Sequence, residues 1–257
     1  MCQGYRFKPN KIMKAADTIK IKDNRSTYPG GKGGSGVYQK IINLIPPHDI
    51  YIETHLGSGA ILRNKKPAAV NIGIDIDPVV TNAWVGTRRD LTIINEDASG
   101  WLRQYQFTGR EFVYADPPYL METRKGGKLY NFEYTTEDHV GLIEILKGLP
   151  CNVMISGYWS ELYGRLLSGW NSISFEAQTR GGPATEFLWF NYPEPTVLHD
   201  YSFIGDDFKK RERIRKKKDR WVSRLLQMPD LERNAIVESI LEYMRDPASP
   251  ENRMKDL

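Results

Sequence analysis

Residues 28–192 alternate between two patterns of apolar positions, and each pattern predicts a different element. Short apolar runs bounded by glycine, proline or polar residues are typical of buried strands. Such runs occupy residues 50–53, 70–76, 91–94, 112–115, 153–156, 173–175 and 187–192. Before and between them, apolar residues recur at helical spacing, as at Val37, Ile41 and Ile45 and again over 137–149. Strands alternating with helices predict an α/β fold with a doubly wound, mostly parallel sheet.

The segments on either side of this region have a different character. Residues 1–27 are polar and basic, and we expect them to form an irregular leader. After Pro193-Glu194-Pro195 the chain becomes basic and helical in pattern, with Pro229 separating two amphipathic helices. The sequence therefore predicts a leader over 1–27, a main domain that would carry the chemistry over 28–192, and a basic helical C-terminal extension over 193–257.

Composition narrows the class of protein. The 257 residues are 40% hydrophobic and 26% charged, which suits one α/β domain with a small appendage. No apolar run approaches the ~20 residues of a membrane-spanning helix, and the leader lacks the apolar centre of a signal peptide. We therefore expect a cytoplasmic protein without a membrane partner. Two cysteines and four histidines are scattered, so neither a disulfide framework nor a metal site is predicted.

Positive charge is concentrated in the extension. The net charge of the chain is +4, yet residues 205–224 alone carry +6, which leaves the remainder slightly negative. Such a segment favours a polyanionic partner, although a solvated helix face or a flexible tail would have the same composition. The candidate phosphate-binding cations are Lys209, Lys210, Arg211, Arg213, Arg215, Lys216, Lys217, Lys218 and Arg220.

The most specific motif is Asp116-Pro117-Pro118-Tyr119, which follows an apolar strand. An exocyclic amine on a base is a poor nucleophile, because its lone pair is delocalised into the ring. The Asp116 carboxylate and the Pro117 carbonyl can accept its two N–H bonds and direct the lone pair outward. Pro118 helps to restrict the loop, and Tyr119 can stack on a base extruded from a duplex. The alternative is a proline turn that merely closes a strand.

Three weaker motifs also follow predicted strands. Glu53-Thr54-His55-Leu56-Gly57-Ser58-Gly59 provides a glycine turn where a ligand can approach the backbone. Asp75-Ile76-Asp77 comes about twenty residues later, where an acid can bind ribose hydroxyls of a nucleoside cofactor. Asp97 follows the next strand and could meet the adenine of that cofactor. Each could also be only a turn or a helix cap, but their common placement predicts a nucleoside pocket.

The GxGxxG match over 31–36 lacks a preceding strand, so it predicts neither a dehydrogenase nor a nucleotide triphosphatase.

Together with Tyr28-Pro29-Gly30-Gly31-Lys32, these motifs resemble the Dam-type family of DNA adenine methyltransferases, in particular compact members from phages and prophages. The strand 185–192 and the basic segment after it add to the resemblance, which covers roughly residues 28–192. It implies a class I S-adenosylmethionine-dependent methyltransferase fold, S-adenosylmethionine as cofactor, double-stranded DNA as partner, and methylation of a flipped adenine at N6 without metal. It assigns catalysis to Asp116, Pro117, Pro118 and Tyr119. It assigns the cofactor to Tyr28, Gly31, Lys32, Glu53, Gly57, Gly59, Asp75 and Asp97.

Two features depart from that family. Thr54-His55 stands where the family has Pro-Phe, so the resemblance does not extend to the family's usual aromatic contact with the cofactor. The family also inserts a target-recognition domain before the catalytic motif, whereas residues 78–115 leave room for one helix and one strand. DNA contact must then come from the basic extension or from the loop 120–136. The loop's candidates are Arg124, Lys125 and Lys128, accompanied by Tyr130 and Phe132.

Two other functions fit the same motifs. A methyltransferase acting on an exocyclic amine of RNA can use a similar loop, and Asp at position 116 favours DNA adenine only by resemblance. A DNA-binding protein on an inactive methyltransferase fold is the second alternative, which the presence of Asp116, Gly57 and Gly59 disfavours. We further expect a monomer in solution.

Overall fold

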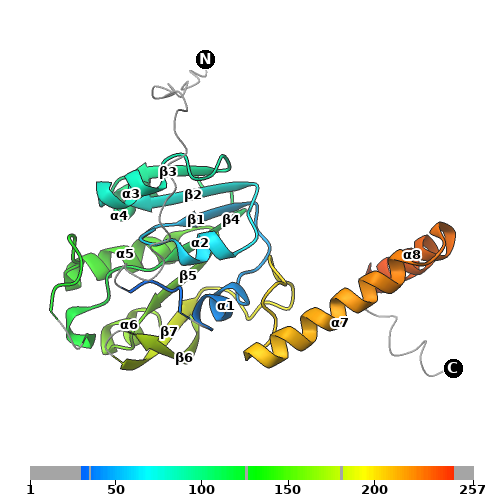
Figure 1. Cartoon of the computed structure of the whole chain (residues 1–257). Helices are drawn as coiled ribbons and strands as arrows, with labels where there is room; N and C mark the ends of the chain where they lie inside the picture. Colours follow the sequence, from blue (N-terminus) through cyan, green and yellow to red (C-terminus); the bar gives the residue numbers. More distant parts are fainter. Residues whose placement is uncertain (1–29, 35, 125–126, 180–181, 246–257) are drawn as a thin grey trace, which may run out of the picture. The chain divides into compact units, whose positions relative to one another are not determined.

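The computed structural model describes residues 30–34, 36–124, 127–179 and 182–245. The chain divides into two compact units after Tyr201, and each is described by itself (Figure 1). No helix in these described ranges has both the length and the apolarity needed to cross a bilayer.

The first unit is built on one seven-stranded sheet in the order β3-β2-β1-β4-β5-β7-β6. The strands are β1 (Ile50–Glu53), β2 (Val70–Asp75), β3 (Leu91–Asn95), β4 (Glu111–Ala115), β5 (Asn152–Gly157), β6 (Asn171–Thr179) and β7 (Gly182–Phe190). Neighbours from β3 to β5 are parallel, while β7 runs antiparallel to both β5 and β6. The doubly wound, mostly parallel sheet predicted from the apolar pattern is confirmed.

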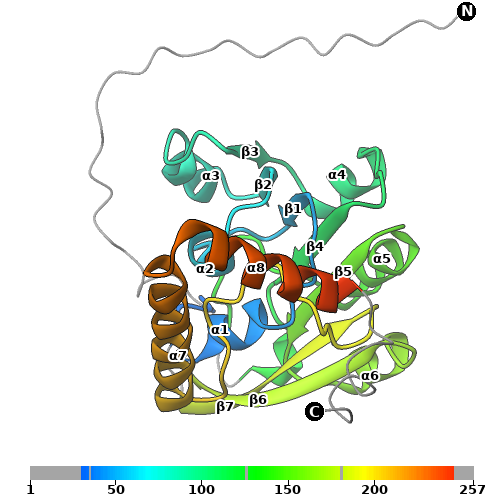
Figure 2. The same ribbon diagram turned by 90° about the vertical axis from the view of Figure 1, so that its right-hand side faces the viewer.

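Helices cover both faces of this sheet, α1, α2 and α3 on one and α4, α5 and α6 on the other (Figure 2). They are α1 (Val37–Ile42), α2 (Ala60–Asn64), α3 (Pro78–Trp84), α4 (Ala98–Gln104), α5 (Thr136–Gly148) and α6 (Glu161–Leu166). Because both faces are covered, β4 is buried along its whole length, which explains its continuous apolar run. Ile52, Val113 and Val153 from three adjacent strands pack with Leu142 and Ile143 of α5 in the core.

The elements between β2 and the end of β4 differ from the prediction. Residues 78–115 hold two helices and two strands rather than one of each. Both helices are short, and an aspartate begins each: Asp77 accepts a hydrogen bond from Val79 N, and Asp97 accepts one from Gly100 N. Side-chain capping stabilises short helices whose length alone gives little sequence signal. The estimate of room for only one helix and one strand was therefore wrong, whereas both strands match the apolar runs predicted at 91–94 and 112–115.

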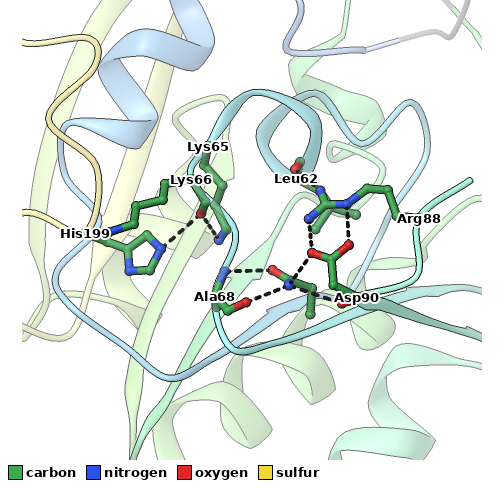
Figure 3. A network of polar contacts seen from close by, with 8 residues as sticks. Leu62, Lys65, Lys66, Ala68, Arg88, Asp90 and His199 are labelled. Atoms are coloured by element: carbon green, nitrogen blue, oxygen red, sulfur yellow. Dashed lines mark hydrogen bonds and ion pairs between the residues drawn. The ribbon is translucent and has the colours of Figure 1, made fainter.

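A segment beyond β7 closes the edge of the first unit where the strands begin. His199 N donates to Ile45 O at 2.9 Å, and Lys66 N donates to Asp200 Oδ2 at 2.8 Å. The His199 ring stacks on His48 with 3.9 Å between ring centres. Next to it, the α2–β2 loop is held by a network that includes the Arg88–Asp90 ion pair (Figure 3). Residues 193–201 therefore belong with the sheet rather than with the helical extension predicted over 193–257.

The second unit contains the two helices predicted for the extension, α7 (Phe208–Leu226) and α8 (Asp230–Arg245). Asp207 begins α7 by accepting a hydrogen bond from Lys210 N. No residue of α7 is buried, and the large apolar side chain of Trp221 is exposed. The helix thus presents its cations to solvent.

Candidate active site

A pocket opens at the carboxyl edge of the sheet, beside the point where the chain crosses from β3 back to β4. This is the position at which ligands bind in doubly wound sheets. Eight predicted site residues from distant parts of the chain line it: Gly31, Lys32, Glu53, Gly57, Gly59, Asp75, Asp97 and Asp116. Pro118 lines the pocket as well, while Pro117 and Tyr119 are buried next to it. Tyr28 lies outside the described residues.

The glycine turn after β1 forms one wall of the pocket. Gly57 and Gly59 have φ values of +44° and +59°, which only glycine adopts without strain. Gly57 N donates to Asp75 Oδ2 at 2.8 Å, and Trp84 Nε1 donates to Gly57 O at 3.1 Å. A Cβ on Gly59 would lie 2.2 Å from the Trp84 ring, so the turn and the ring fit only if this residue is glycine.

We expect Gly59→Ala to lower the free energy of unfolding by about 2–4 kcal/mol, since it adds overpacking to left-handed strain. Gly86→Ala is the matched control, because Gly86 has φ +74° but no atom within 4 Å of its Cβ position. The control carries strain alone and should lose about 1–2 kcal/mol. Urea unfolding monitored by circular dichroism measures both, and equal losses would show that the Trp84 contact is unimportant.

Asp75 at the end of β2 and Asp97 after β3 accept hydrogen bonds from backbone N–H groups and also line the pocket. Asp75 accepts from Gly57 N and, at 2.9 Å, from Asp77 N, one bond on each carboxylate oxygen. Burial raises the pKa of Asp75 despite these two bonds. Asp77 accepts from Asn131 Nδ2 at 2.8 Å in addition to capping α3. Each carboxylate oxygen has a second lone pair, so these hydrogen bonds leave Asp75 and Asp97 able to accept another from a ligand hydroxyl or amine.

Glu53 lies at the end of β1, where burial raises its pKa to about 8 and the nearby Asp116 adds to the effect. Tyr51 OH and Leu62 N both donate to its Oε2, at 2.8 and 3.0 Å. These bonds oppose the shift without cancelling it. Glu53 Oε1 takes neither of these two bonds, and Glu53 is one of the residues that line the pocket.

Lys32 and Asp116 form a buried ion pair at the centre of the site. Lys32 Nζ lies 2.7 Å from Asp116 Oδ1 and 2.8 Å from Oδ2. Its side chain is 5% exposed. Burial by itself would lower the pKa of Lys32, but the carboxylates of Asp116 and Glu186 outweigh it and raise the pKa. Lys32, predicted to contact the cofactor, is therefore also the cationic partner of the predicted catalytic carboxylate.

Two further residues, which no sequence motif had indicated, contact the predicted catalytic motif. Ser156 Oγ donates to Asp116 Oδ1 at 2.7 Å. Glu186 on β7 accepts a 2.6 Å bond from Tyr119 OH, and burial raises its pKa. The available signals were a serine at the end of an apolar strand and a single acid within another. Tyr119 itself is 8% exposed, with Lys32 Nζ 4.7 Å from its ring centre.

The loop between β4 and α5 contributes to the pocket more than to an outer surface. Arg124 is 5% exposed and pairs through both terminal nitrogens with Glu133. Tyr130, Asn131, Phe132 and Tyr134 all line the pocket. Arg124 thus shapes the loop, Lys125 lies outside the described residues, and Lys128 is exposed. Contact of this loop with DNA stays a prediction.

Thr54 and His55, which stand where the Dam-type family has Pro-Phe, take part in hydrogen bonds at the pocket. His55 Nδ1 lies 2.8 Å from Thr54 Oγ1, and His55 Nε2 lies 2.9 Å from Tyr134 OH. Burial lowers the pKa of His55 to about 3, so the ring is neutral at physiological pH. The histidine links the glycine turn to the β4–α5 loop across the pocket.

The charge of the pocket suits a cationic nucleoside. Its described lining includes the carboxyl groups of Glu53, Asp75, Asp77, Asp97 and Asp116. Lys32 is the only lysine or arginine among these lining residues, and Asp116 pairs with it. A ligand with hydroxyl groups and an ammonium or sulfonium charge would find hydrogen-bond acceptors here, whereas the pKa of about 8 leaves Glu53 mostly protonated at neutral pH in the cofactor-free protein. Among the described residues, no group of three His, Cys, Asp or Glu side chains could hold a metal ion.

No family model matches the chain, and no curated protein matches its sequence. Three solved structures illustrate the similarity in fold. Precorrin 8W decarboxylase from Methanobacterium thermoautotrophicum is 11% identical, with a TM-score of 0.38 over 59% of this chain and 86% of that one. The 23S rRNA methyltransferase ErmE is 13% identical, with a TM-score of 0.41 over 63% and 68%. Magnesium protoporphyrin IX methyltransferase from Synechocystis, with bound S-adenosylmethionine, is 12% identical, with a TM-score of 0.40 over 61% and 76%.

Likeness at this level indicates no substrate, and the fold is assigned from the sheet itself. A seven-stranded sheet in the order 3-2-1-4-5-7-6 with an antiparallel seventh strand is typical of class I S-adenosylmethionine-dependent methyltransferases. The chain has that fold.

Proposed function

We propose that this protein transfers a methyl group from S-adenosylmethionine to the N6 amino group of adenine in double-stranded DNA. The observation that carries the proposal is the Asp116 carboxylate, which stands at the end of β4 on the wall of a pocket suited to a nucleoside. The motif resemblance to Dam-type enzymes supports adenine in DNA as the substrate.

The residues of the pocket divide between cofactor and substrate. Glu53, Asp75 and Asp97 would hold the ammonium, ribose and adenine parts of the cofactor, whose sulfonium supplies an electrophilic methyl group. Asp116 would accept one N–H of the flipped adenine, and the Pro117 carbonyl would accept the other. With both N–H bonds accepted, the N6 lone pair would be directed at the methyl group that the cofactor supplies, the methyl leaving sulfur with the bonding pair retained on sulfur. Asp116 would then take up one N6 proton and pass it to water.

Tyr119 would support the flipped base. The bond from its hydroxyl to Glu186 fixes the ring within the site, so that the ring can stack on an extruded base. Because each base has a π-face, this contact holds a base without selecting adenine. Selection would come from the two acceptors, which require an exocyclic amine.

Transfer of labelled methyl from S-adenosylmethionine to DNA and to RNA, followed by digestion to nucleosides, tests the proposal. We expect label in N6-methyladenine from duplex DNA. Label found only in RNA would replace the proposal with the RNA alternative. Binding of DNA without transfer to any nucleic acid would favour the inactive DNA-binding alternative.

Phosphate contact is proposed for α7, on which cations recur at helical spacing. At about 100° per residue, Lys209, Arg213 and Arg220 fall within ~40° of one another on one side. Arg211, Arg215 and Lys218 fall on the opposite side, where Arg215 already pairs with Glu212 at 2.8 Å. With about five cations near the first side in contact with phosphates, the log–log salt dependence of DNA binding should have a slope of roughly −4 to −5.

Changing Lys209, Arg213 and Arg220 to glutamine should make that slope shallower by about 2–3, since each lost phosphate contact removes about 0.9. Changing Arg211, Arg215 and Lys218 to glutamine removes the same charge from the other side and should alter the slope by less than about 1. Titration of a fluorescent duplex at several salt concentrations measures both. Equal changes would show that α7 acts only through its overall charge.

A further inference from the structure

The two oxygens of the Asp116 carboxylate have different surroundings. Oδ1 receives two donors, Lys32 Nζ at 2.7 Å and Ser156 Oγ at 2.7 Å. Oδ2 receives only Lys32 Nζ among the described residues, at 2.8 Å. A carboxylate oxygen has two lone pairs, so the donors occupy both on Oδ1 and leave one on Oδ2.

Strand pairing places Ser156 next to this carboxylate. Ala115 of β4 pairs with Ile155 of the parallel β5, so the following residues, Asp116 and Ser156, lie level with each other. Ser156 is completely buried, and its hydroxyl has a single hydrogen to donate. The 2.7 Å bond to Asp116 is much shorter than the 3.4 Å separation from Ala115 O, so the hydroxyl points at the carboxylate.

Tyr114 sets the direction of that hydroxyl. Its phenolic oxygen lies 3.1 Å from Ser156 Oγ, and both side chains are buried. Because the serine hydrogen is used on Asp116, Tyr114 must be the donor in this pair. Burial raises the pKa of Tyr114 far above its ordinary value, so the phenol keeps the proton that it donates. The chain of bonds runs from Tyr114 through Ser156 to Asp116 Oδ1.

We propose that Ser156 is a positioning residue for the Asp116 carboxylate. Together with Lys32 it saturates Oδ1 of Asp116, so that Oδ2 is the oxygen that accepts the N–H of the substrate amine. Tyr114 holds the Ser156 hydroxyl in the orientation that this role requires. The inference rests on the proposed function in taking an exocyclic amine as the substrate. Without the serine donor, the carboxylate can rotate about its bond to Cβ. The free lone pair of Oδ2 would then point at the substrate amine in only part of the protein molecules.

Single-turnover methyl transfer and cofactor binding are measured on wild type, Ser156→Ala, Tyr114→Phe and the double variant. Ser156→Ala should slow transfer about 10- to 100-fold, the range for a lost hydrogen bond to a charged group, and leave the cofactor Kd within about twofold. Tyr114→Phe should slow transfer less, about 3- to 10-fold. Because Tyr114 acts through Ser156, the double variant should be no slower than Ser156→Ala.

Ser174→Ala on the exposed side of β6 is the matched control and should behave as wild type. Additive losses in the double variant would overturn the relay from Tyr114. A wild-type rate in Ser156→Ala, or an equal loss in rate and cofactor affinity, would overturn the positioning role.

An infrared measurement separates this proposal from the proposed function. The difference spectrum between each protein and its Asp116→Asn derivative isolates the Asp116 carboxylate stretch, whatever the substrate. Ser156→Ala should shift that band, and an unshifted band would refute the bond even in an enzyme that methylates DNA. If wild type methylates no nucleic acid but the band shifts, the bond stands and both the proposed function and the role toward an amine fall.

Discussion

Replacing Asp116 with asparagine is expected to slow single-turnover methyl transfer by about 10²- to 10³-fold while the cofactor still binds. The change removes the negative charge that accepts the substrate N–H and stabilises positive charge developing on nitrogen, and groups of this kind contribute about that much. The cofactor contacts assigned to Glu53, Asp75 and Asp97 come from other strands and remain. Quenched-flow transfer from labelled cofactor measures the rate, and calorimetry measures the affinity.

Asp49→Asn is the matched control for this change. Asp49 is exposed, pairs with Arg110 and precedes β1, at the edge of the sheet opposite the pocket. It should transfer at the wild-type rate. Asp116→Asn also leaves Lys32 without its partner carboxylate, so the unfolding free energy of each variant is recorded to exclude partial unfolding. A folded Asp116→Asn protein with wild-type transfer would defeat the proposed mechanism.

Replacing Glu53 with glutamine is expected to stabilise the cofactor-free protein at alkaline pH. An ordinary glutamate has a pKa of about 4.3 in the unfolded chain, whereas burial raises the pKa of folded Glu53 to about 8. Between these two values folding takes up a proton, so the unfolding free energy falls as pH rises. Each pH unit in this window removes about 1.4 kcal/mol, which amounts to a few kcal/mol in all. Glutamine can still accept from Tyr51 OH and Leu62 N, but it cannot ionise.

Urea unfolding between about pH 5 and pH 9 measures this difference. The Glu53→Gln curve should be flatter than wild type, meet it near pH 5 and lie above it by a few kcal/mol near pH 9. Glu144→Gln, an exposed change on α5, should follow wild type throughout. Parallel curves for wild type and Glu53→Gln would show that Glu53 ionises normally in the folded protein. The cofactor should bind Glu53→Gln more weakly if Glu53 contacts its ammonium group.

Local patterns in the sequence anticipated the elements of the sheet but not the length of its helices. All seven predicted apolar runs fall on strands, and the nearly continuous burial of β1, β4 and β5 explains the unbroken apolar signal of these three. Helices α3 and α4 span seven residues each, too short for a reliable apolar period. They depend on the caps Asp77 and Asp97, whose motifs were compatible with helix caps as well as with cofactor contacts. The place where 193–201 packs was equally invisible, since its partners lie near residues 45 and 66.

Apolar runs alone show which residues stand at the ends of strands: the glycine turn, Asp75, Asp97 and the predicted catalytic motif lie at or just after such ends. Which of these residues touch depends on tertiary packing. Lys32 pairs with Asp116 across 84 positions, and Ser156 reaches the same carboxylate across 40. Glu186 meets Tyr119 across 67. These contacts depend on strand order and register, which long-range packing selects, whereas apolar periodicity reports only whether a residue's own element is buried.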